Sequence, residues 1–587
     1  MIELDRLLEA GVISPLDYHF GRLLKRIANG ADPASVPLAG VLASRQNREG
    51  HVCIPLDRMA GQPLIPGDED ATAPPLGQWR EDLQKSNVVG APNDFAPLIA
   101  DSADRLYLYR YWRYQDRLVQ SIRDRLDEPA ERPSTGELAT ALDRFFPPDP
   151  DGTDGQRAAA RTALTRRFCV ISGGPGTGKT TTVAKILALI ARLSGNGSPA
   201  VALAAPTGKA AARLQESIRS AKAGPAFESV RDAVPETAAT VHRLLGAIPD
   251  SPDFRHHRGR PLSADVVVVD ESSMVDLALM SKLAQALKPS ARLILLGDRD
   301  QLASVEAGAV LGDICNTGGS RTTAPIADSI VHLETNYRFG ADSGIGAAAR
   351  AINDGDAEAA IGAFRDPDRT DTRWRRPLNP RSPSETFVTA VREGFRDYLS
   401  RLDRPAEALA AFDGFRILCA LRRGPFGAPA VNTLVERILE KSGLIGKSGT
   451  WYPGRPVMIT RNDYPLRLFN GDIGITASDP DAGGDLRVWL PAADGGLRKL
   501  HPRRLPEHET VYAMTVHKSQ GSEFGRVMLI LPDRPAPVLT RELLYTGITR
   551  AREQVEIHGG VPIFRRAVEN QIKRSSGLRD ALWGVSM

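Results

Sequence analysis

The sequence predicts an α/β protein with two domains built on parallel sheets, and three observations support this. From about residue 156 to 340, short apolar runs rich in β-formers alternate with stretches of helical pattern. Each run ends in a polar or glycine-rich segment, as parallel strands do where their carboxyl-end loops begin. A second alternating region covers roughly residues 341–440 and resumes after residue 510. The runs of the first region are Cys169–Ser172, Val201–Ala204, Val266–Val269 and Leu293–Leu296.

Length and composition set the expected number of domains. A chain of 587 residues is too long for one hydrophobic core, so we expect three or four domains. The net charge of +4 fits a mixed solvated surface as well as it fits nucleic-acid binding, and it excludes neither. The expected domains are residues 1–110, which are helical and bind a partner, a connector at 111–150, one sheet domain at 151–340, a second at 341–445 with 510–587, and a small β-barrel inserted at 446–509.

The sequence carries no sign of export or of membrane insertion. Its first residues, MIELDRLLEAG, lack the basic region and apolar run of a signal peptide, and no apolar run approaches membrane-spanning length. The four cysteines stand far apart, which favours reduced core thiols over a zinc or iron–sulfur site. We therefore expect a cytoplasmic protein. The cysteines are Cys53, Cys169, Cys315 and Cys419.

A phosphate-binding loop follows the first apolar run. GGPGTGKT, residues 173–180, stands between a strand pattern and a helix pattern, which is the context that a P-loop requires. Its glycines let backbone N–H groups converge on phosphates, and the helix N-terminus adds partial positive charge. Lys179 would reach the β- and γ-phosphates of ATP, and the Thr180 hydroxyl would bind Mg²⁺. The predicted nucleotide-binding residues of this loop are Gly173, Gly174, Pro175, Gly176, Thr177, Gly178, Lys179, Thr180 and Thr181.

Two acids after a buried strand complete the predicted ATP site. Four consecutive valines lead into Asp270 and Glu271. Asp270 is placed to hold Mg²⁺ through water, and Glu271 to act as general base on the attacking water. Adjacent acids can also begin an ordinary loop, but the presence of a P-loop favours the catalytic interpretation. Gln301, which follows the next strand in LILLGDRDQL, is placed to contact the γ-phosphate.

The remaining sequence blocks resemble superfamily-one helicases of the RecD type. Three further blocks, LCALRRGPFG (418–427), GRPVMITRND (454–463) and LFNGDIG (468–474), resemble in particular the RecD subunits of RecBCD, or exodeoxyribonuclease V, as does GHVCIPLDR (50–58). The resemblance implies two RecA-like P-loop motor domains, a helical N-terminal domain, an SH3-like β-barrel insertion and a bacterial source. The general helicase blocks are APTGKAAARL (205–214), TVHRLLG (240–246), VVVVDESSMVD (266–276), GDRDQLASVEAG (297–308), LETNYRF (333–339), TVHKSQGSEF (515–524) and LLYTGITRAR (543–552).

This resemblance extends the ATP site to both motor domains. Arg338 and Arg550 match the family's two arginine fingers, which neutralise charge on the transferring phosphoryl group, and both are expected to come from the second motor domain. An ordinary surface helix arginine is the alternative for Arg550. Gln156 matches the adenine-reading glutamine, and Gly521 and Glu523 match positions that face the nucleotide sugar and phosphates. ATP in the cleft would then draw the lobes together.

In this family the other face of the same loops holds single-stranded DNA. A histidine that follows a strand is more often structural, but both histidines of this set stand in blocks that match the family's DNA contacts. The GDRDQL block lacks the base-stacking aromatic that is usual in relatives moving 3′ to 5′, which favours 5′ to 3′ movement. Two grips, one per lobe, would alternate. The matching residues are Pro206, Thr207, Lys209, His242, Thr515 and His517.

Two other segments have more than one interpretation. In RLYLYRYWRYQDRL, residues 105–118, aromatic residues alternate with arginines. Bases could stack on these aromatics, but period-2 alternation favours a half-buried strand of a connector that packs against the motor. Residues 247–264 form either a short hairpin that splits the duplex or a disordered surface loop, and the sequence favours neither.

Taken together, the resemblance implies an ATP-dependent 5′–3′ helicase that acts on single-stranded DNA at duplex ends. It would work with RecB-like and RecC-like subunits in recombinational repair of double-strand breaks, near the bacterial nucleoid. The roughly 150 residues before the P-loop favour such a subunit over a stand-alone RecD-like helicase. An ATP-gated DNA-binding scaffold is a second alternative, which the intact catalytic residues disfavour. No nuclease-like acidic cluster lies outside the motor blocks, so exonuclease activity is assigned to a partner.

Overall fold

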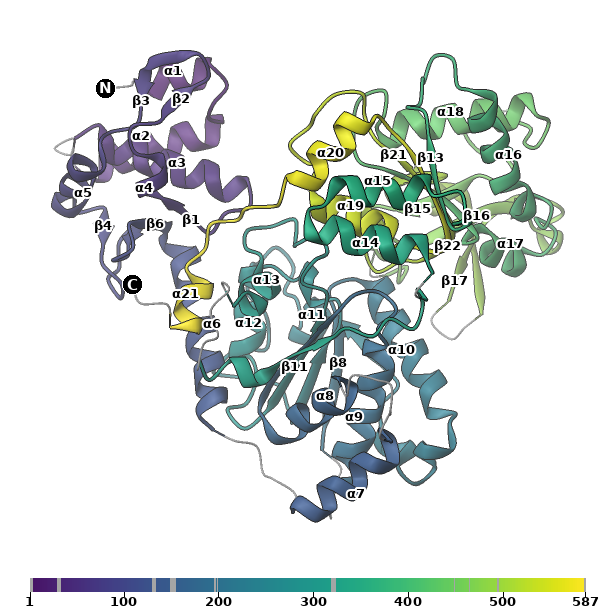
Figure 1. Ribbon diagram of the computed structural model, residues 1–587, viewed down its shortest axis with the longest axis horizontal. Coiled ribbons are helices and arrows are strands. Elements are labelled where there is room, and N and C mark those ends of the chain that lie inside the picture. The colour runs from purple at the N-terminus through teal and green to yellow at the C-terminus, as the bar shows by residue number, and fades with distance from the viewer. Residues whose placement is uncertain are drawn as a thin grey trace.

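Two parallel sheets form the centres of the two halves of the chain, and a smaller unit is attached to each half (Figure 1). The structure is a computed structural model. It describes residues 4–28, 33–128, 134–147, 155–194, 197, 199–317, 324–340, 342–447, 449–463, 465–492 and 496–584. Within these ranges, no helix combines the length and the apolar composition of a membrane-crossing segment.

The first sheet has six parallel strands, in the order β12 (Ile330–Leu333), β7 (Phe168–Gly173), β11 (Arg292–Gly297), β10 (Val266–Val269), β8 (Val201–Ala205) and β9 (Ala238–Thr240). Its helices are α7 (Thr135–Phe145), α8 (Gly155–Thr165), α9 (Lys179–Leu193), α10 (Gly208–Lys222), α11 (Val241–Leu245), α12 (Leu277–Gln285) and α13 (Val310–Cys315). Because helices cover both faces, the strands β7 and β10 are buried along their whole length. Val267 and Val269 pack with α11, α12 and α13, whereas Val266 and Val268 pack with α7, α8, α9 and α10. The four strands expected here are confirmed.

The second sheet has five parallel strands, in the order β13 (Thr372–Arg375), β22 (Ala551–His558), β21 (Phe524–Ile530), β14 (Phe415–Cys419) and β20 (Ala513–Thr515). Around it lie α14 (Gly344–Asp354), α15 (Ala357–Arg365), α16 (Glu385–Leu399), α17 (Pro405–Phe412), α18 (Ala428–Lys441), α19 (Arg541–Ile548) and α20 (Val561–Glu569). The β14 strand belongs to one sequence region and its neighbours β20 and β21 to the other. The two separated regions therefore contribute strands to one sheet. We call the six-stranded sheet with its helices the first lobe, and the five-stranded sheet with its helices the second lobe.

An antiparallel sheet is inserted between α18 and β20. Its order is β18 (Leu497–Leu500), β17 (Leu486–Pro491), β16 (Ile473–Ser478), β15 (Pro456–Ile459) and β19 (His508–Thr510). Val457, Ile459, Val488 and Leu490 form its small core together with Leu468. Among the described residues, the outer strands β18 and β19 are not hydrogen-bonded to each other, so the pairing is that of an open sheet.

The N-terminal unit contains more β structure than the sequence indicated. Its helices are α1 (Leu4–Glu9), α2 (Pro15–Ile27), α3 (Ser35–Arg48), α4 (Leu56–Met59) and α5 (Leu76–Lys85). They pack against a sheet ordered β1 (Cys53–Pro55), β6 (Arg105–Leu108), β5 (Leu98–Ala100) and β4 (Val89–Gly90), beside a hairpin of β2 (Pro63–Ile65) and β3 (Asp68–Thr72). Strands this short carry too few residues to display a period of two.

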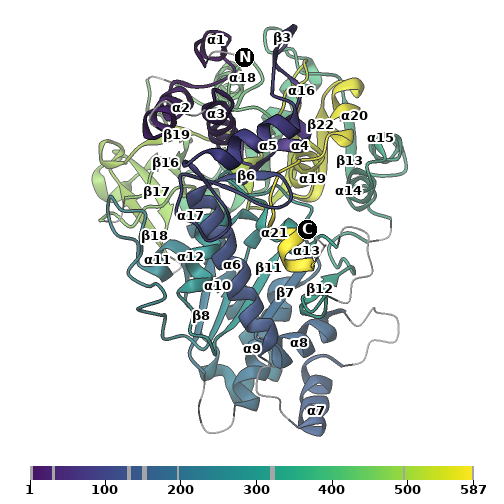
Figure 2. The same cartoon turned by 90° about the vertical axis from the view of Figure 1, so that its left-hand side faces the viewer.

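The aromatic segment forms a helix for most of its length, so the expected strand is wrong after Leu108. The helix α6 runs from Tyr109 to Asp127 and connects the N-terminal unit to the first lobe (Figure 2). Its residues Tyr111, Leu118 and Ile122 are buried against the first lobe, which follows the helical period. The expected packing of this connector against the motor is confirmed. The predicted boundary near residue 150 lies outside the described residues, which omit 129–133 and 148–154.

The C-terminal segment returns from the second lobe to the first and to the N-terminal unit (Figure 1). The Val52 N–H donates to the Ser575 carbonyl at 2.8 Å, and the Gly577 N–H donates to Gln115 Oε1 at 3.0 Å. Beyond them, α21 (Leu578–Trp583) packs beside α6 and α13. Trp583 is buried there and its Nε1 donates to the Ile314 carbonyl at 3.1 Å. The segment therefore joins three units.

Replacing Trp583 with alanine should destabilise the first lobe. Loss of a buried indole leaves a cavity and an unpaired Ile314 carbonyl, so we expect the free energy of unfolding to fall by about 3–5 kcal/mol. Calorimetric unfolding of the full chain would measure this. The control Leu16→Ala removes an exposed leucine and should change stability by less than about 0.5 kcal/mol. Equal effects of the two substitutions would contradict the docking of α21.

Candidate nucleotide site and DNA-binding surface

The P-loop wraps tightly between β7 and α9 because three of its positions require glycine. Gly176 and Gly178 have positive φ angles of 88° and 77°, which disfavour other residues. A Cβ atom on Gly173 would lie 2.7 Å from Thr177 Oγ1. Lys179, at the start of α9, turns back over the loop and donates from Nζ to the carbonyls of Gly173 (2.5 Å) and Gly174 (3.0 Å). The ammonium group of Lys179 therefore lies across the concave side of the loop.

The two predicted acids follow β10 directly, next to this loop. Glu271 adopts a left-handed backbone with φ of 50°, a strained conformation that recurs at functional sites. Its N–H donates to Asp270 Oδ1 at 2.8 Å. Burial and the neighbouring charge of Glu271 raise the pKa of Asp270 to about 6, although the Glu271 N–H, Lys179 and Arg213 act in the opposite direction. A bound metal ion would offset the negative charge that burial makes unfavourable on this carboxylate.

Glu523, after η6 (His517–Ser519) in the second lobe, joins the lobes through two arginines. Its Oε1 lies 2.5 Å from Arg213 Nη2 and 2.6 Å from Arg338 Nη2. Burial alone would raise the pKa of Glu523, but the guanidinium groups of Arg213 and Arg338 lower it to about 2. Gly521, two residues earlier, has a φ of 67° and accepts a 3.4 Å hydrogen bond from Arg213 through its carbonyl.

Arg338 does not come from the second motor domain, so that expectation is wrong. It lies in the segment after β12, a strand of the first sheet, and this segment docks on the P-loop. Asn336 Nδ2 donates to the Pro175 carbonyl at 2.8 Å, and the Tyr337 N–H donates to the Gly176 carbonyl at 2.9 Å. The first lobe therefore positions Arg338, and only its partner Glu523 belongs to the second lobe.

Arg550 comes from the second lobe and is only 2% exposed, which excludes a surface helix arginine. Its Nε donates to the Thr546 carbonyl at 3.1 Å and its Nη1 to the Ser522 carbonyl at 3.3 Å. Burial lowers its pKa, while the charges of Glu271 and Glu523 raise it. Arg550 thus lies within electrostatic range of both catalytic-site acids.

Gln301 lies at a second contact between the lobes. Its Nε2 donates to Asp298 Oδ2 at 2.9 Å, and the same oxygen accepts a 2.9 Å hydrogen bond from the Tyr545 hydroxyl of the second lobe. One residue further, the Leu302 N–H donates to Thr546 Oγ1 at 2.9 Å. Tyr545 also reaches the P-loop, since a Cβ atom on Gly174 would lie 2.8 Å from its hydroxyl.

These residues fit a bound ATP–Mg²⁺. Two of their buried polar atoms, Gln301 Oε1 and Arg338 Nη1, have no hydrogen-bond partner among the described residues. Buried polar atoms without partners are rare and mark places where a further group binds. Gln156 Nε2 donates weakly to the Thr177 carbonyl at 3.4 Å, so it also lies against the P-loop. Half-buried Thr180 and exposed Thr181 occupy the first turn of α9.

Known proteins match nearly the whole chain. Residues 9–107 match the family described as "RecBCD enzyme subunit RecD, N-terminal domain", 156–307 match "AAA domain" and 510–557 match "UvrD-like helicase C-terminal domain". The RecBCD enzyme subunit RecD of Mycolicibacterium smegmatis is 41% identical, with 98% of each chain covered. That of Haemophilus influenzae is 34% identical, also with 98% of each chain covered.

The chain belongs to the RecD family. The ATP-dependent RecD2 DNA helicase of Deinococcus radiodurans is 31% identical over 85% of this chain and 60% of that protein. A solved structure of Bacteroides Pif1 bound to ssDNA covers 71% of this chain and 94% of that one, at 16% identity and a TM-score of 0.38, too low to add to the argument.

In this RecD-family chain, the predicted DNA residues lie at strand ends in both lobes. Thr207 follows β8 and caps α10, accepting from the Ala210 N–H at 3.2 Å. Thr515 ends β20 and accepts from the Lys518 N–H at 3.3 Å. Both hydroxyl oxygens thus already stabilise local turns. Pro206 is half-buried between β8 and Thr207.

The remaining predicted DNA residues differ in exposure. Burial lowers the pKa of both His242, on α11, and His517, in η6, which favours neutral imidazoles. Neither side chain is fully buried: His242 keeps much of its surface exposed although its ring packs against Phe254, and His517 is half-buried. Lys209 points across to the second lobe, with Nζ 5.8 Å from the centre of the Phe524 ring, and burial lowers its pKa as well.

Sequence reasoning missed Arg213, Asn336 and Tyr545 as site residues. Each lies inside a block that resembles the helicases, namely APTGKAAARL, LETNYRF and LLYTGITRAR respectively. Their side chains act on residues far away in the sequence, namely Glu523, Pro175 and Asp298. The family resemblance therefore marks the blocks that contain these three residues, but no local sequence pattern indicates which distant residues they contact.

Asp270→Asn should stabilise the nucleotide-free chain at neutral pH. Folding moves the pKa of Asp270 from 3.8 to about 6, so above pH 6 the native state carries a disfavoured charge. That penalty disappears as the pH falls from 6 to 3.8. The shift corresponds to a gain of at most about 3 kcal/mol at pH 7 and none at pH 3.5, measured by thermal unfolding. The exposed control Asp232→Asn should show no such pH-dependent gain, and a pH-independent effect at Asp270 would contradict the raised pKa.

Proposed function

We propose that this chain is an ATP-dependent 5′–3′ DNA helicase and translocase. It would act on single-stranded DNA at duplex ends as the RecD-like subunit of a RecBCD-type helicase–nuclease, in recombinational repair of double-strand breaks. Two relatives that cover nearly the whole chain are RecBCD subunits by name, and a third is named a DNA helicase. Such work takes place in the cytoplasm, at the bacterial nucleoid.

The observation that carries this proposal is the Arg213–Glu523–Arg338 cluster beside the P-loop. It makes the contact between the lobes depend on charge at the place where nucleotide phosphates would bind. Lys179, Thr180 and Asp270 would hold the phosphates and Mg²⁺, and bound ATP–Mg²⁺ supplies a phosphoryl group for transfer to water. Glu271 would take the proton from that water, and Arg338 and Arg550 would neutralise charge on the phosphoryl oxygens.

If Glu523 exchanged an arginine partner for another group, the resulting movement would reach a proposed DNA contact only a few residues away in the sequence. Glu523 follows His517 and Thr515 in one continuous segment, which runs from the end of β20 through η6. On the first lobe, α10 carries Arg213 toward Glu523 and is capped at its N-terminus by Thr207. Each lobe thus couples a proposed DNA contact to the same cluster, as alternating grips require.

The finer architecture follows the same proposal. We propose that residues 1–110 form the partner-binding domain and 446–509 an SH3-like insertion, and that 151–340 and 341–445 with 510–587 form the two motors. Phe469 of the insertion lies against the start of α10, because a Cβ atom on Gly208 would be 3.3 Å from it. The insertion therefore borders the first proposed DNA loop. RecB-like and RecC-like subunits would complete the enzyme and supply its nuclease.

Strand displacement on partial duplexes with a 5′ or a 3′ tail tests the proposed activity. We expect ATP-dependent unwinding from the 5′ tail alone, by the chain itself or only once RecB-like and RecC-like partners are added. Lys179→Gln should abolish it, because the phosphates lose their cation. Lys441→Gln, which removes an exposed lysine of α18, should have no effect. Unwinding from the 3′ tail alone would reverse the direction, and ATP-dependent binding without unwinding would indicate a scaffold.

Arg338→Ala should separate hydrolysis from nucleotide binding. Removing a cation that stabilises the transition state should lower kcat by about 10³-fold or more, while the Kd for a non-hydrolysable ATP analogue changes only a few-fold. Steady-state ATPase assays and calorimetric titration measure the two quantities. Arg350→Ala, an exposed arginine of α14, serves as the matched control. Equal losses of kcat and affinity would assign Arg338 to ground-state binding instead.

A further inference from the structure

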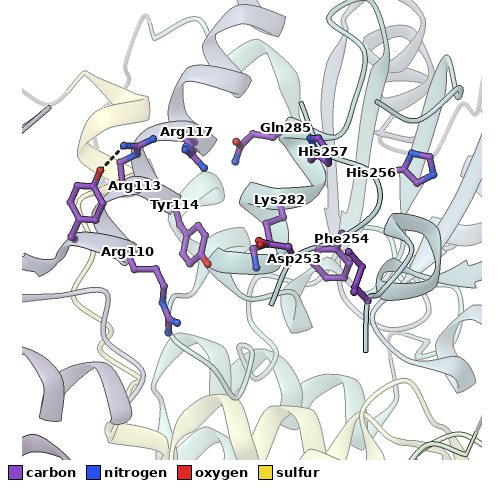
Figure 3. A pocket seen from close by; sticks show the side chains of 12 residues that line it. Arg110, Arg113, Tyr114, Arg117, Asp253, Phe254, His256, His257, Lys282 and Gln285 are labelled. Carbon is purple, nitrogen blue, oxygen red and sulfur yellow. Dashed lines mark hydrogen bonds between the residues drawn. The ribbon is translucent and has the colours of Figure 1, made fainter. Parts of the chain in front are cut away.

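A second concave site lies outside the nucleotide cleft, between α6 and the segment that follows α11 (Figure 3). Its volume is about 800 Å³. One wall is the outer face of α6, the opposite wall is residues 248–257, and α12 contributes Lys282 and Gln285. The opposite wall is ordered by two short antiparallel bridges, Ala247 with Phe254 and His257 with Arg260. It therefore has the hairpin character that was one of the two expectations.

Four cations converge on this cavity. Arg110, Arg113 and Arg117 share one face of α6, since they are spaced by three and four residues, and Lys282 lies across from them. None of the four forms an ion pair within the part of the chain that the structure describes. One acid, Asp253, lines the same cavity. Repulsion among cations held this close favours an anionic ligand.

Aromatic rings lie between the cations. Lys282 Nζ is 5.5 Å from the centres of both the Tyr114 and the Phe254 rings. On α6, Arg113 Nη1 donates to the Tyr109 hydroxyl at 2.6 Å. Alternating guanidinium groups and ring faces match a single nucleic-acid strand, in which phosphates alternate with bases that stack. An acidic peptide would pair with the cations, but its carboxylates would not stack on the aromatic rings.

The cavity is continuous with the proposed DNA surface. His242, the proposed contact on α11, packs edge-to-face against Phe254 with ring centres 5.7 Å apart. Phe254 also lines the cavity. A strand that leaves the motor at His242 therefore meets this cavity next.

We propose that this cavity binds a few nucleotides of single-stranded DNA beside the motor's own track. Arg113 and Arg117 contact phosphates, and Tyr114 and Phe254 stack on bases. The site rests on the proposed function, because it extends a track that runs past His242. It adds a DNA contact outside the cleft between the two lobes, on the first lobe and α6.

Fluorescence anisotropy of the full chain with oligothymidines tests this site. Lengths of about 4 to 16 nucleotides cover the usual range of single-strand binding sites. For Arg113→Ala/Arg117→Ala we expect unchanged affinity for the shortest oligonucleotides and about tenfold or greater loss for the longest. The negative slope of log affinity against log salt concentration should become shallower by about 1.4, because two phosphate contacts are lost and each contributes about 0.7. The control Arg437→Ala/Lys441→Ala removes two exposed cations with the same spacing from α18 and should bind normally.

The alternative results are distinct. Unchanged affinity at every length overturns the site, and so does an equal loss at every length, which would place both arginines in the motor track. Normal DNA binding with lost association to RecB-like and RecC-like subunits would make the cavity a protein interface. Failure of the unaltered chain to bind even short oligonucleotides would instead refute the proposed function.

A second measurement does not depend on substitutions that affect folding. Oligothymidines with iododeoxyuridine at successive positions, irradiated on the unaltered chain, should crosslink to Tyr114 or Phe254 at one end of the longer strands. Peptide mass spectrometry would identify the attachment point. Crosslinks confined to the strand ends β8 and β20, with none in the cavity, would overturn the proposal.

Discussion

A buried carboxylate between two guanidinium groups determines how the lobes meet. Glu523 of the second lobe contacts Arg213 of α10 and Arg338 of the segment that docks on the P-loop. Removing one partner of this partly exposed cluster leaves the remaining charges less well compensated in a poorly solvated place, which costs free energy. The arginines can therefore leave Glu523 only if another anion replaces it, and the phosphates of a nucleotide are the anions that the neighbouring P-loop is built to hold.

The topology of the sheets explains how one cluster can serve two surfaces. In each lobe, parallel strands end at the same edge, so loops that are distant in the sequence become neighbours there. The nucleotide residues and the proposed DNA residues leave that edge on consecutive strands or in the same segment. A shift of the segment that runs from η6 to Glu523 would therefore displace His517 and Glu523 together.

The helix α6 has a comparable role on the outer side of the molecule. One of its faces is buried against the first lobe, where Leu118 and Ile122 hold it. The opposite face carries arginines and tyrosines into the basic cavity. The C-terminal segment returns from the second lobe and α21 packs beside α6, so α6 contacts both the first lobe and the C-terminal end.

The sequence by itself determined both sheets, the P-loop and the acids of β10, because strand burial and phosphate binding leave local patterns of valine and glycine. It also determined the RecD relationship. It misjudged the aromatic segment, where a period of two and a helical stripe overlap, and it overlooked short strands in the N-terminal unit. Only the tertiary structure decided that the segment of Arg338 docks on the P-loop, that Arg213 and Tyr545 belong to the site, and that α6 meets residues 248–257. These depend on contacts between residues hundreds of positions apart, and sequence patterns are local.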